Sequence, residues 1–226
     1  MTDLADALRE PSPIGADEGP AERAVAAAAC RARGISLAEV LERAELQVRL
    51  DRKYLVSADR LERLTGLLAP ELDVLDIAGR RAFAYESRYF DTPRLLTYRE
   101  HLQGRRDRFK VRTRSYLDSA ESMFEVKLAD PQGATIKRRS EHPFDERHRI
   151  TPSARRHLSM ALQAAGRRVP AELVPVCATA YHRTTFIARD GSARLTCDHD
   201  LVVSNDDRAE RALSDHVLVE VKSAHG

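Results

Sequence analysis

Hydrophobic and polar residues alternate along much of the chain, and a period of two predicts β-strands with two unlike faces. The stretch DRFKVRTRSY is the clearest case, because one face carries the cations Lys110, Arg112 and Arg114. The other face carries Phe109 and Val111. The same test predicts strands at about 48–56, 81–92, 107–116, 121–129, 134–141, 179–188, 193–203 and 217–223.

A period of three to four residues predicts helices between these strands. Ser36 and Glu39 form a capping box, Ser57 stands where an N-cap is expected, and Thr151 precedes a proline. Gly166 is expected to end the last helix. The predicted helices are 36–46, 58–69 and 153–166, and residues 93–102 are expected to be a short helix or irregular.

The order of these elements predicts an α+β fold. Breaker-rich turns, such as ADPQG and the ARDGSA hairpin, join neighbouring strands, so we expect antiparallel pairing in one large sheet. Residues 1–20 are rich in Pro, Gly, Asp and Glu. We therefore expect residues 1–35 to be a disordered or partly helical tail and residues 36–226 to form the folded domain.

Composition narrows the classes of function. The chain has 226 residues and is 32% charged, but its net charge is only +2, so a strongly positive site must come from local arrangement. Aromatic residues are few and Trp is absent, which argues against a nucleic-acid partner. Three isolated cysteines, no long apolar run and no leader pattern favour a cytoplasmic protein.

Charged positions recur on one face of nearly every predicted strand. For a single strand, a wet outer face is the ordinary explanation. Several strands of cations on one open sheet would repel each other, however, whereas a sheet curled with these faces inward makes a cationic cavity for a multivalent anion. The cations in these positions are Lys53, Lys110, Arg112, Arg114, Lys127, Lys137, Arg139, Arg183, Arg194 and Lys222.

A chain of phosphates is the anion that best fits such a cavity, because Arg and Lys both bind phosphoryl oxygens. The same faces also carry Glu125, Asp198, Asp200 and Glu220. Carboxylates beside phosphates are typical ligands of Mg²⁺ or Mn²⁺. The combination favours phosphoryl transfer, in which positioning and charge neutralisation do most of the catalysis.

Eight short motifs follow one another along the chain: RxDxKY, SRYFDT, FKVRTR, FEVK, KRR, YHR, RLTCD and LVEVK. In this order they resemble the VTC domain, the polyphosphate polymerase branch of the triphosphate tunnel metalloenzymes. The resemblance covers about residues 46–222. It implies an antiparallel β-tunnel, closed or nearly closed, with a charged lumen and flanking helices.

The resemblance also implies an activity: metal-dependent transfer of the terminal phosphoryl group of ATP to polyphosphate or orthophosphate. It implies catalytic roles for Arg112, Arg114, Lys127 and Arg183, with Glu220 holding Mn²⁺ or Mg²⁺. Some relatives work beside membrane proteins, so a membrane-protein partner is an expectation too. The further residues expected to bind phosphates are Lys53, Lys137, Arg139, Tyr181, Arg194 and Lys222.

Two other functions share the same residues. The first is a tunnel hydrolase of triphosphates, although the sister CYTH branch opens with ExExK and this chain has Arg49 and Asp51 at the two acidic positions. The second is a polyphosphate-binding module without catalysis. Family members continue into a Ser-Lys-Tyr segment after the VEVK strand, and we expect the domain ending at Gly226 to lack that lysine.

Three further patterns have a structural and a functional interpretation. In CDHD, alternation sends Cys197 and His199 away from Asp198 and Asp200, so a zinc site is not expected, and Asp198 favours a salt bridge over a second metal contact. Asp91 is expected to cap a strand end. The basic cluster at 98–108 is either a solvated loop or a funnel that attracts polyanions.

Overall fold

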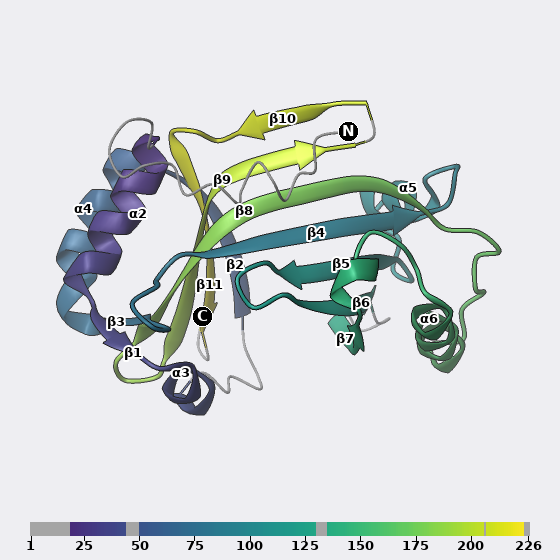
Figure 1. Cartoon of the computed structure of the whole chain (residues 1–226), viewed down its shortest axis with the longest axis horizontal. Helices are drawn as coiled ribbons and strands as arrows, with labels where there is room; N and C mark the ends of the chain where they lie inside the picture. The colour runs from purple at the N-terminus through teal and green to yellow at the C-terminus, as the bar shows by residue number, and fades with distance from the viewer. Residues whose placement is uncertain (1–18, 44–49, 130–134, 206, 224–226) are drawn as a thin grey trace. The chain divides into compact units, whose positions relative to one another are not determined.

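The computed structural model describes residues 19–43, 50–129, 135–205 and 207–223. The helices in these ranges are α2 (Pro20–Arg31), α3 (Leu37–Arg43), α4 (Ala58–Leu68), α5 (Leu96–Leu102) and α6 (Pro152–Ala164) (Figure 1). The strands are β1 (Arg33–Ile35), β2 (Leu50–Ser57), β3 (Leu72–Leu75), β4 (Phe83–Asp91), β5 (Phe109–Tyr116), β6 (Glu121–Ala129), β7 (Thr135–His142), β8 (Val174–Ala188), β9 (Ala193–Ser204), β10 (Ala209–Ala212) and β11 (His216–Ser223).

These strands form one sheet in the hydrogen-bonded order β2-β11-β9-β8-β4-β5-β6-β7, with β1, β3 and β10 attached beside this path. The pairs β2–β11, β9–β11, β4–β5, β5–β6 and β6–β7 are antiparallel, whereas β1 pairs β3 in parallel. The predicted α+β class with a largely antiparallel, tunnel-type sheet and flanking helices is confirmed. The order has two ends, β2 and β7, which is compatible with the nearly closed form of the prediction.

The chain divides into two compact units. Unit 1 comprises Met1–Ala84, Ala180–Val202 and Glu210–Gly226, and unit 2 comprises Tyr85–Thr179 and Val203–Ala209. Each unit has its own hydrophobic core. No helix within the described residues is long and apolar enough to cross a membrane.

The core of unit 1 lies under α2 and α4, which run side by side (Figure 1). Cys197, Val217 and Val219 face these helices from β9 and β11. The buried side of α2 is made mostly of alanines such as Ala24 and Ala28, whose small side chains let the helix approach closely. A face of alanines gives a weak apolar stripe, so the sequence predicted this helix only loosely. That the tail ends at residue 35 and the folded domain begins at residue 36 stays a prediction.

The core of unit 2 forms where α6 covers one face of β5 and β6. Phe109 and Val111 pack there with Phe124 from β6 and with Leu158 and Leu162 from α6. Because side chains alternate along a strand, burying these residues turns the cations of β5 to the opposite face. The two unlike faces predicted for this strand are therefore confirmed.

Helix ends follow the predicted signals with one exception. The Ser36 backbone N donates to Glu39 Oε2 at 2.8 Å, and Thr151 Oγ1 accepts from the Ala154 N at 3.1 Å. Gly166 has φ +67° after α6, as expected for a helix stop. Ser57 occupies the N-cap position of α4, but its side chain makes no capping hydrogen bond. Instead the neighbouring Ala58 N donates to the backbone of Asp215 at 2.9 Å.

The remaining differences concern short or extended strands. β8 begins at Val174, five residues before the predicted start of the strand 179–188. β1, β3 and β10 have only three or four residues each, which is too short for alternation to be recognised. The last residues of the predicted helix 36–46 and most of the turn ADPQG lie outside the described residues.

Two candidate phosphate-binding clusters

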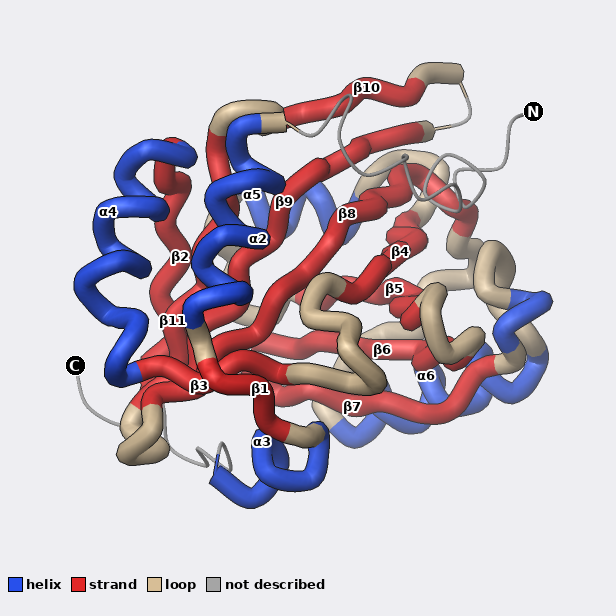
Figure 2. The backbone as a smooth tube through the Cα atoms, turned by 60° about the vertical axis from the view of Figure 1, so that its left-hand side comes forward, coloured by secondary structure: helices blue, strands red, loops and turns tan. Residues whose placement is uncertain are grey.

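The charged face of β5, β6 and β7, which lie side by side in unit 2 (Figure 2), arranges its residues in rows across the strands. Arg112 stands opposite Glu125, and Glu125 stands opposite Arg139. In the next row Lys127 stands opposite Lys137. Cross-strand neighbours of this kind lie within side-chain reach. We call the following residues the unit 2 cluster: Tyr89, Arg112, Arg114, Glu125, Lys127, Lys137 and Arg139.

Glu125 is the centre of this cluster and is only 1% exposed. Arg112 donates from Nε and Nη2 to Glu125 Oε2 at 2.8 and 2.7 Å, and Lys137 Nζ contacts Oε1. Arg112 also donates from Nη1 to the Tyr89 hydroxyl at 3.1 Å. The sequence analysis did not single out Tyr89, although its alternation with Tyr85 along β4 could have placed it on this face.

Charge within the unit 2 cluster is unbalanced, because several cations surround one carboxylate. Burial raises the pKa of Glu125, but Arg112, Arg114 and Lys137 outweigh it and lower that pKa to about 2. Burial, together with the charges of Arg112 and Arg114, lowers the pKa of Lys127 to about 8. Glu125 therefore stays ionised, and Lys127 is held among like charges.

Arg114 and Arg139 complete the cluster in different ways. Arg114 lies opposite Ser87 on β4 and Met123 on β6, and its Nε is buried without a hydrogen-bond partner among the described residues. A buried donor without an acceptor is unfavourable in the folded protein, and an anion would satisfy it. Arg139 stands opposite Glu125 on β7, but its side chain is exposed.

A second cluster lies in unit 1, where β8, β9, β11 and β2 contribute. Arg183 donates from Nε and Nη2 to the two carboxylate oxygens of Asp198 at 2.6 and 2.7 Å. The predicted salt bridge of Asp198 is thereby confirmed. The guanidinium of Arg183 also lies 5.3 Å from the ring centroid of the buried Tyr181. This stacking orients the guanidinium from a second side.

The pairing of β11 with β2 and β9 brings the remaining residues of this cluster together. Glu220 stands between Lys53 on β2 and Thr196 on β9. Lys222 Nζ lies 3.5 Å from Glu220 Oε1. Burial raises the pKa of Glu220, but Lys222, Lys53 and Arg183 together hold it below its usual value. We call the following residues the unit 1 cluster: Asp51, Lys53, Tyr181, Arg183, Arg194, Thr196, Asp198, Glu220 and Lys222.

Asp200 corrects one prediction from alternation. It was expected on the same face as Asp198, but it has φ +55°, which interrupts the extended backbone of β9. The carboxylate of Asp200 instead lies 3.4 Å from Nδ1 of His182. Because His182 and Arg183 are consecutive along β8, their side chains lie on opposite faces of the strand, and it is Arg183 that binds Asp198. Asp200 therefore belongs to neither the salt bridge nor the unit 1 cluster.

Asp91 has the structural role that the sequence predicted. It is 2% exposed at the end of β4, and its oxygens accept from the backbone N–H groups of Thr92, Thr97 and Tyr98 at 2.7 to 2.9 Å. These bonds tie the strand to the first turn of α5. The residue therefore positions the segment that leads into β5, the strand carrying Arg112.

A model of the VTC domain family matches residues 48–225, well over half of the chain's 226 residues. The chain belongs to the VTC domain family. The resemblance drawn from the sequence motifs is confirmed, and with it a fold of the type that handles triphosphates. Among curated proteins, none matches this VTC domain.

Several solved structures resemble this VTC domain, among them the following three. An adenylate cyclase candidate from Bacillus halodurans is 15% identical, with 78% of this chain and 80% of that chain covered and a TM-score of 0.45. HpAC1 from Hippeastrum, an adenylyl cyclase candidate with a dominant triphosphatase activity, is 14% identical, with 77% and 78% covered and a TM-score of 0.49. The PH1012 protein from Pyrococcus horikoshii OT3 is 12% identical, with 78% of each covered and a TM-score of 0.40. At these scores the likenesses carry no argument about function.

Divalent metals are the cofactors expected of such a fold, and the unit 1 cluster fits one in a limited way. Among the described residues, no three His, Cys, Asp or Glu side chains gather as a metal site. Asp198 is engaged by Arg183, which leaves Glu220 as the half-buried carboxylate nearest the cations. Mg²⁺ commonly uses one or two carboxylates together with substrate phosphates. The cluster thus fits a metal that arrives with a triphosphate, not a metal held by protein alone.

The structure places all the predicted site residues of the VTC domain in one or the other cluster. Unit 2 holds Arg112, Arg114, Lys127, Lys137 and Arg139, and unit 1 holds Lys53, Tyr181, Arg183, Arg194, Glu220 and Lys222. That all of them line one tunnel stays a prediction. Lys53 lies on β2, which is an edge strand. The first six residues of β2 are all exposed, so burial does not distinguish the two faces that were expected for this strand.

Proposed function

We propose that this VTC domain is a polyphosphate polymerase that transfers the γ-phosphoryl group of ATP to polyphosphate or orthophosphate with Mn²⁺ or Mg²⁺. The single observation that supports it most is the unit 2 cluster, in which Arg112, Arg114, Lys127 and Lys137 surround one buried carboxylate, Glu125. A cluster that is too positive when empty is complementary to a chain of negative phosphates. Burial and the charges of Arg112 and Arg114 together lower the pKa of Lys127 to about 8, so this excess of charge contributes to the shift.

The chemistry needs no nucleophile from the protein. A terminal oxygen of the acceptor phosphate attacks the γ-phosphorus of ATP and forms the new P–O bond. The bond from that phosphorus to the bridging oxygen breaks, and ADP leaves with the electron pair. Positioning and charge neutralisation are the main contributions that a protein makes to this reaction.

Several residues of the two clusters can be given a role in this reaction. Arg114 and Lys127, with donors not used up by Glu125, bind phosphoryl oxygens and neutralise the charge that spreads over them in the transition state. Arg112 is held in place by Glu125 and Tyr89, so its guanidinium is preorganised. Arg183 is held in the same way by Asp198. When bound at Glu220, the metal would neutralise β- and γ-phosphate charge.

Incubation of the full chain with ATP and Mn²⁺ tests the proposal. We expect a long polymer on a polyacrylamide gel, with one ADP formed for each phosphate added. Release of only ADP and orthophosphate would contradict a polymerase and identify a triphosphate hydrolase, because water would then be the acceptor. Polyphosphate binding without turnover would identify a binding module.

A matched pair of variants separates the proposed site from the general charge of the strand. Arg114→Gln removes a cation of the unit 2 cluster, whereas Arg138→Gln removes one from the opposite face of β7, where Arg138 stands opposite the buried Val126. Loss of polymer synthesis in the first variant only is the expected result. Equal losses in both variants would contradict the role given to Arg114.

A further inference from the structure

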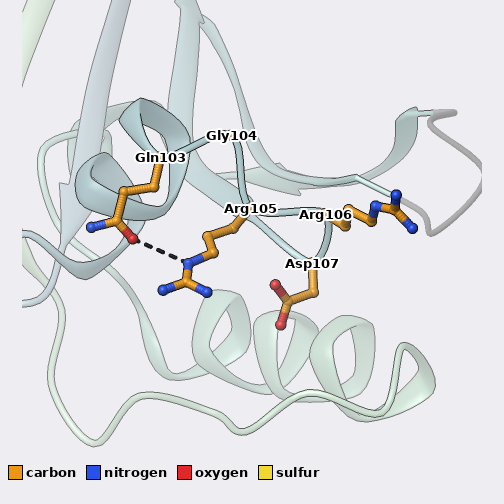
Figure 3. A pocket seen from close by; sticks show the side chains of 5 residues that line it. All are labelled: Gln103, Gly104, Arg105, Arg106 and Asp107. Carbon is orange, nitrogen blue, oxygen red and sulfur yellow. Dashed lines mark hydrogen bonds between the residues drawn. The ribbon is translucent and has the colours of Figure 1, made fainter.

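The segment Gln103–Arg108, which we call the basic loop, joins α5 to β5 in unit 2. Its first five residues, Gln103–Asp107, line an open surface pocket of about 630 Å³ (Figure 3). Gly104 has φ +62°, and its N–H donates to the His101 carbonyl at 3.1 Å. The Arg105 N–H donates to the Glu100 carbonyl at 2.9 Å. These bonds fold the loop back on the end of α5 and fix the direction of the arginines that follow.

Acidic residues around the basic loop are occupied by an arginine from outside it. Arg167 Nη2 lies 3.4 Å from Glu100 Oε2 and 3.6 Å from Asp107 Oδ2. Arg105 donates to the neutral Gln103 side chain at 3.1 Å, and Arg106 extends away from Asp107 (Figure 3). No acidic side chain in the part of the chain that is described pairs with either arginine. Both are exposed and keep donors for an outside anion.

The basic loop leads directly into β5, whose charged face begins at Lys110 and continues with Arg112 and Arg114. Arg108, the last residue of the loop, donates from Nη1 to the Arg105 carbonyl at 2.8 Å. Lys110 Nζ lies 3.4 Å from His101 Nε2 at the end of α5, and Lys110 stands opposite Lys127 of the unit 2 cluster. The pKa of His101 is lowered by this positive charge. Lys110 makes the largest contribution, followed by burial and by Arg108.

We propose that the basic loop and Lys110 form a second anion subsite, which binds the distal phosphates of a linear polyphosphate whose end occupies the unit 2 cluster. The inference rests on the proposed function and specifies its substrate as a long chain. A strand rises ~3.4 Å per residue, so Lys110 lies ~7 Å along β5 from Arg112 and the loop lies further on. A short anion bound at Arg112 and Arg114 ends before the loop, whereas a long chain continues onto it.

Binding of two ligands by the full chain tests this subsite. In Arg105→Gln/Arg106→Gln, we expect the Kd for long-chain polyphosphate to rise ~10-fold, which corresponds to about 1.4 kcal/mol. The slope of log K against log salt should become shallower by ~1.4, because about two phosphate contacts are lost at ~0.7 each. The Kd for tripolyphosphate should stay the same. The variant should also keep the unfolding midpoint of the parent in urea, since both side chains are exposed.

Arg60→Gln/Arg63→Gln is the matched control, because it removes the same charge from exposed positions on α4 of unit 1. Unchanged long-chain affinity in the loop variant would overturn the subsite and leave the basic loop as a solvated segment. An equal loss in the α4 variant would overturn it too, since net charge would then explain the effect. Tripolyphosphate that fails to bind the parent, while long chains bind and respond to the loop variant, would contradict the proposed function but support the subsite.

Discussion

Arg112 donates two hydrogen bonds to a single oxygen of Glu125, at 2.8 and 2.7 Å, and leaves the other oxygen to Lys137. From the sequence, this carboxylate was interpreted as one of several metal ligands. Its burial and its two cationic partners indicate a different role, as the counter-ion that lets cations gather on one face of β5, β6 and β7. Removing this counter-ion should therefore lower the stability of the fold and leave metal binding unchanged.

We predict that Glu125→Gln lowers the free energy of unfolding by ~3 kcal/mol, because it leaves buried cations without their partner. Urea denaturation of the variant and the parent measures the change. Glu121→Gln, an exposed position on the same strand, is the control and should change stability by less than ~0.5 kcal/mol. Tripolyphosphate should restore part of the stability lost in Glu125→Gln. Similar stabilities for the two variants would refute the counter-ion role.

A second prediction concerns Arg114, whose charge helps to lower the pKa of Lys127 to about 8. In Arg114→Ala, that pKa should rise toward the ordinary value of lysine, while phosphoryl transfer falls by ~100-fold, the effect of losing one transition-state donor. NMR titration of the lysine side-chain signals measures the pKa. Arg138→Ala, on the opposite face of β7, should leave both quantities unchanged. A pKa of Lys127 that does not respond to Arg114 would show that burial alone sets it.

A third prediction is that tripolyphosphate binds more weakly as the pH rises through about 8. The empty cluster holds Lys127 at that pKa, and a bound polyanion favours the charged ammonium, so binding takes up protons above pH 8. Calorimetry in two buffers of different ionisation enthalpy measures the uptake. In Lys127→Arg the charge is permanent, and the pH dependence near 8 should disappear. An unchanged pH profile in this variant would assign the titration to another group.

A fourth prediction applies the same pKa to stability. The pKa of Lys127 is about 8 in the folded protein and 10.5 ordinarily, so protonation favours the unfolded chain. The loss of folding stability caused by a charged Lys127 is therefore complete below pH 8, and it fades as the pH rises from about 8 to 10.5. Lys127→Met should therefore stabilise the protein by on the order of 1 to 3 kcal/mol at pH 7. The gain over the parent, measured by urea denaturation, should shrink toward pH 10; a constant gain would instead indicate better apolar packing.

Alternation along a single strand was enough to predict the two unlike faces of β5. Phe109 and Val111 identified the buried face of β5, and the cations had to lie on the other. Alternation does not reveal which residues stand opposite each other, because register depends on strand pairing. Alternation therefore could not predict that Arg112 contacts Glu125 and Tyr89. Alternation along β4 could have placed Tyr89 on the charged face, but not its hydroxyl within hydrogen-bond distance of Arg112.

Local backbone conformation explains the other failures. Asp200 was placed by a strict period of two, but its φ of +55° interrupts that period, and the sequence gives no turn signal there. Ser57 stands at a helix start, yet its hydroxyl makes no capping hydrogen bond, and the Ala58 N–H donates to the Asp215 carbonyl in another part of unit 1. The hydrogen bond between Ala58 and Asp215 joins residues distant in sequence. Patterns read along one segment cannot contain that information.

The final prediction concerns the metal. Glu220 lies among Lys222, Lys53 and Arg183, which hold its pKa below the usual value, so it is ionised at neutral pH and can share a divalent cation with a triphosphate. In Glu220→Gln, the Mn²⁺ concentration for half-maximal ATP turnover should rise at least ~10-fold, the effect of ~1.4 kcal/mol lost from one charged ligand. Glu210→Gln, exposed on β10, should leave it unchanged. A metal requirement that is the same in both variants would mean that the phosphates alone bring the metal, and that Glu220 serves only to pair with Lys222.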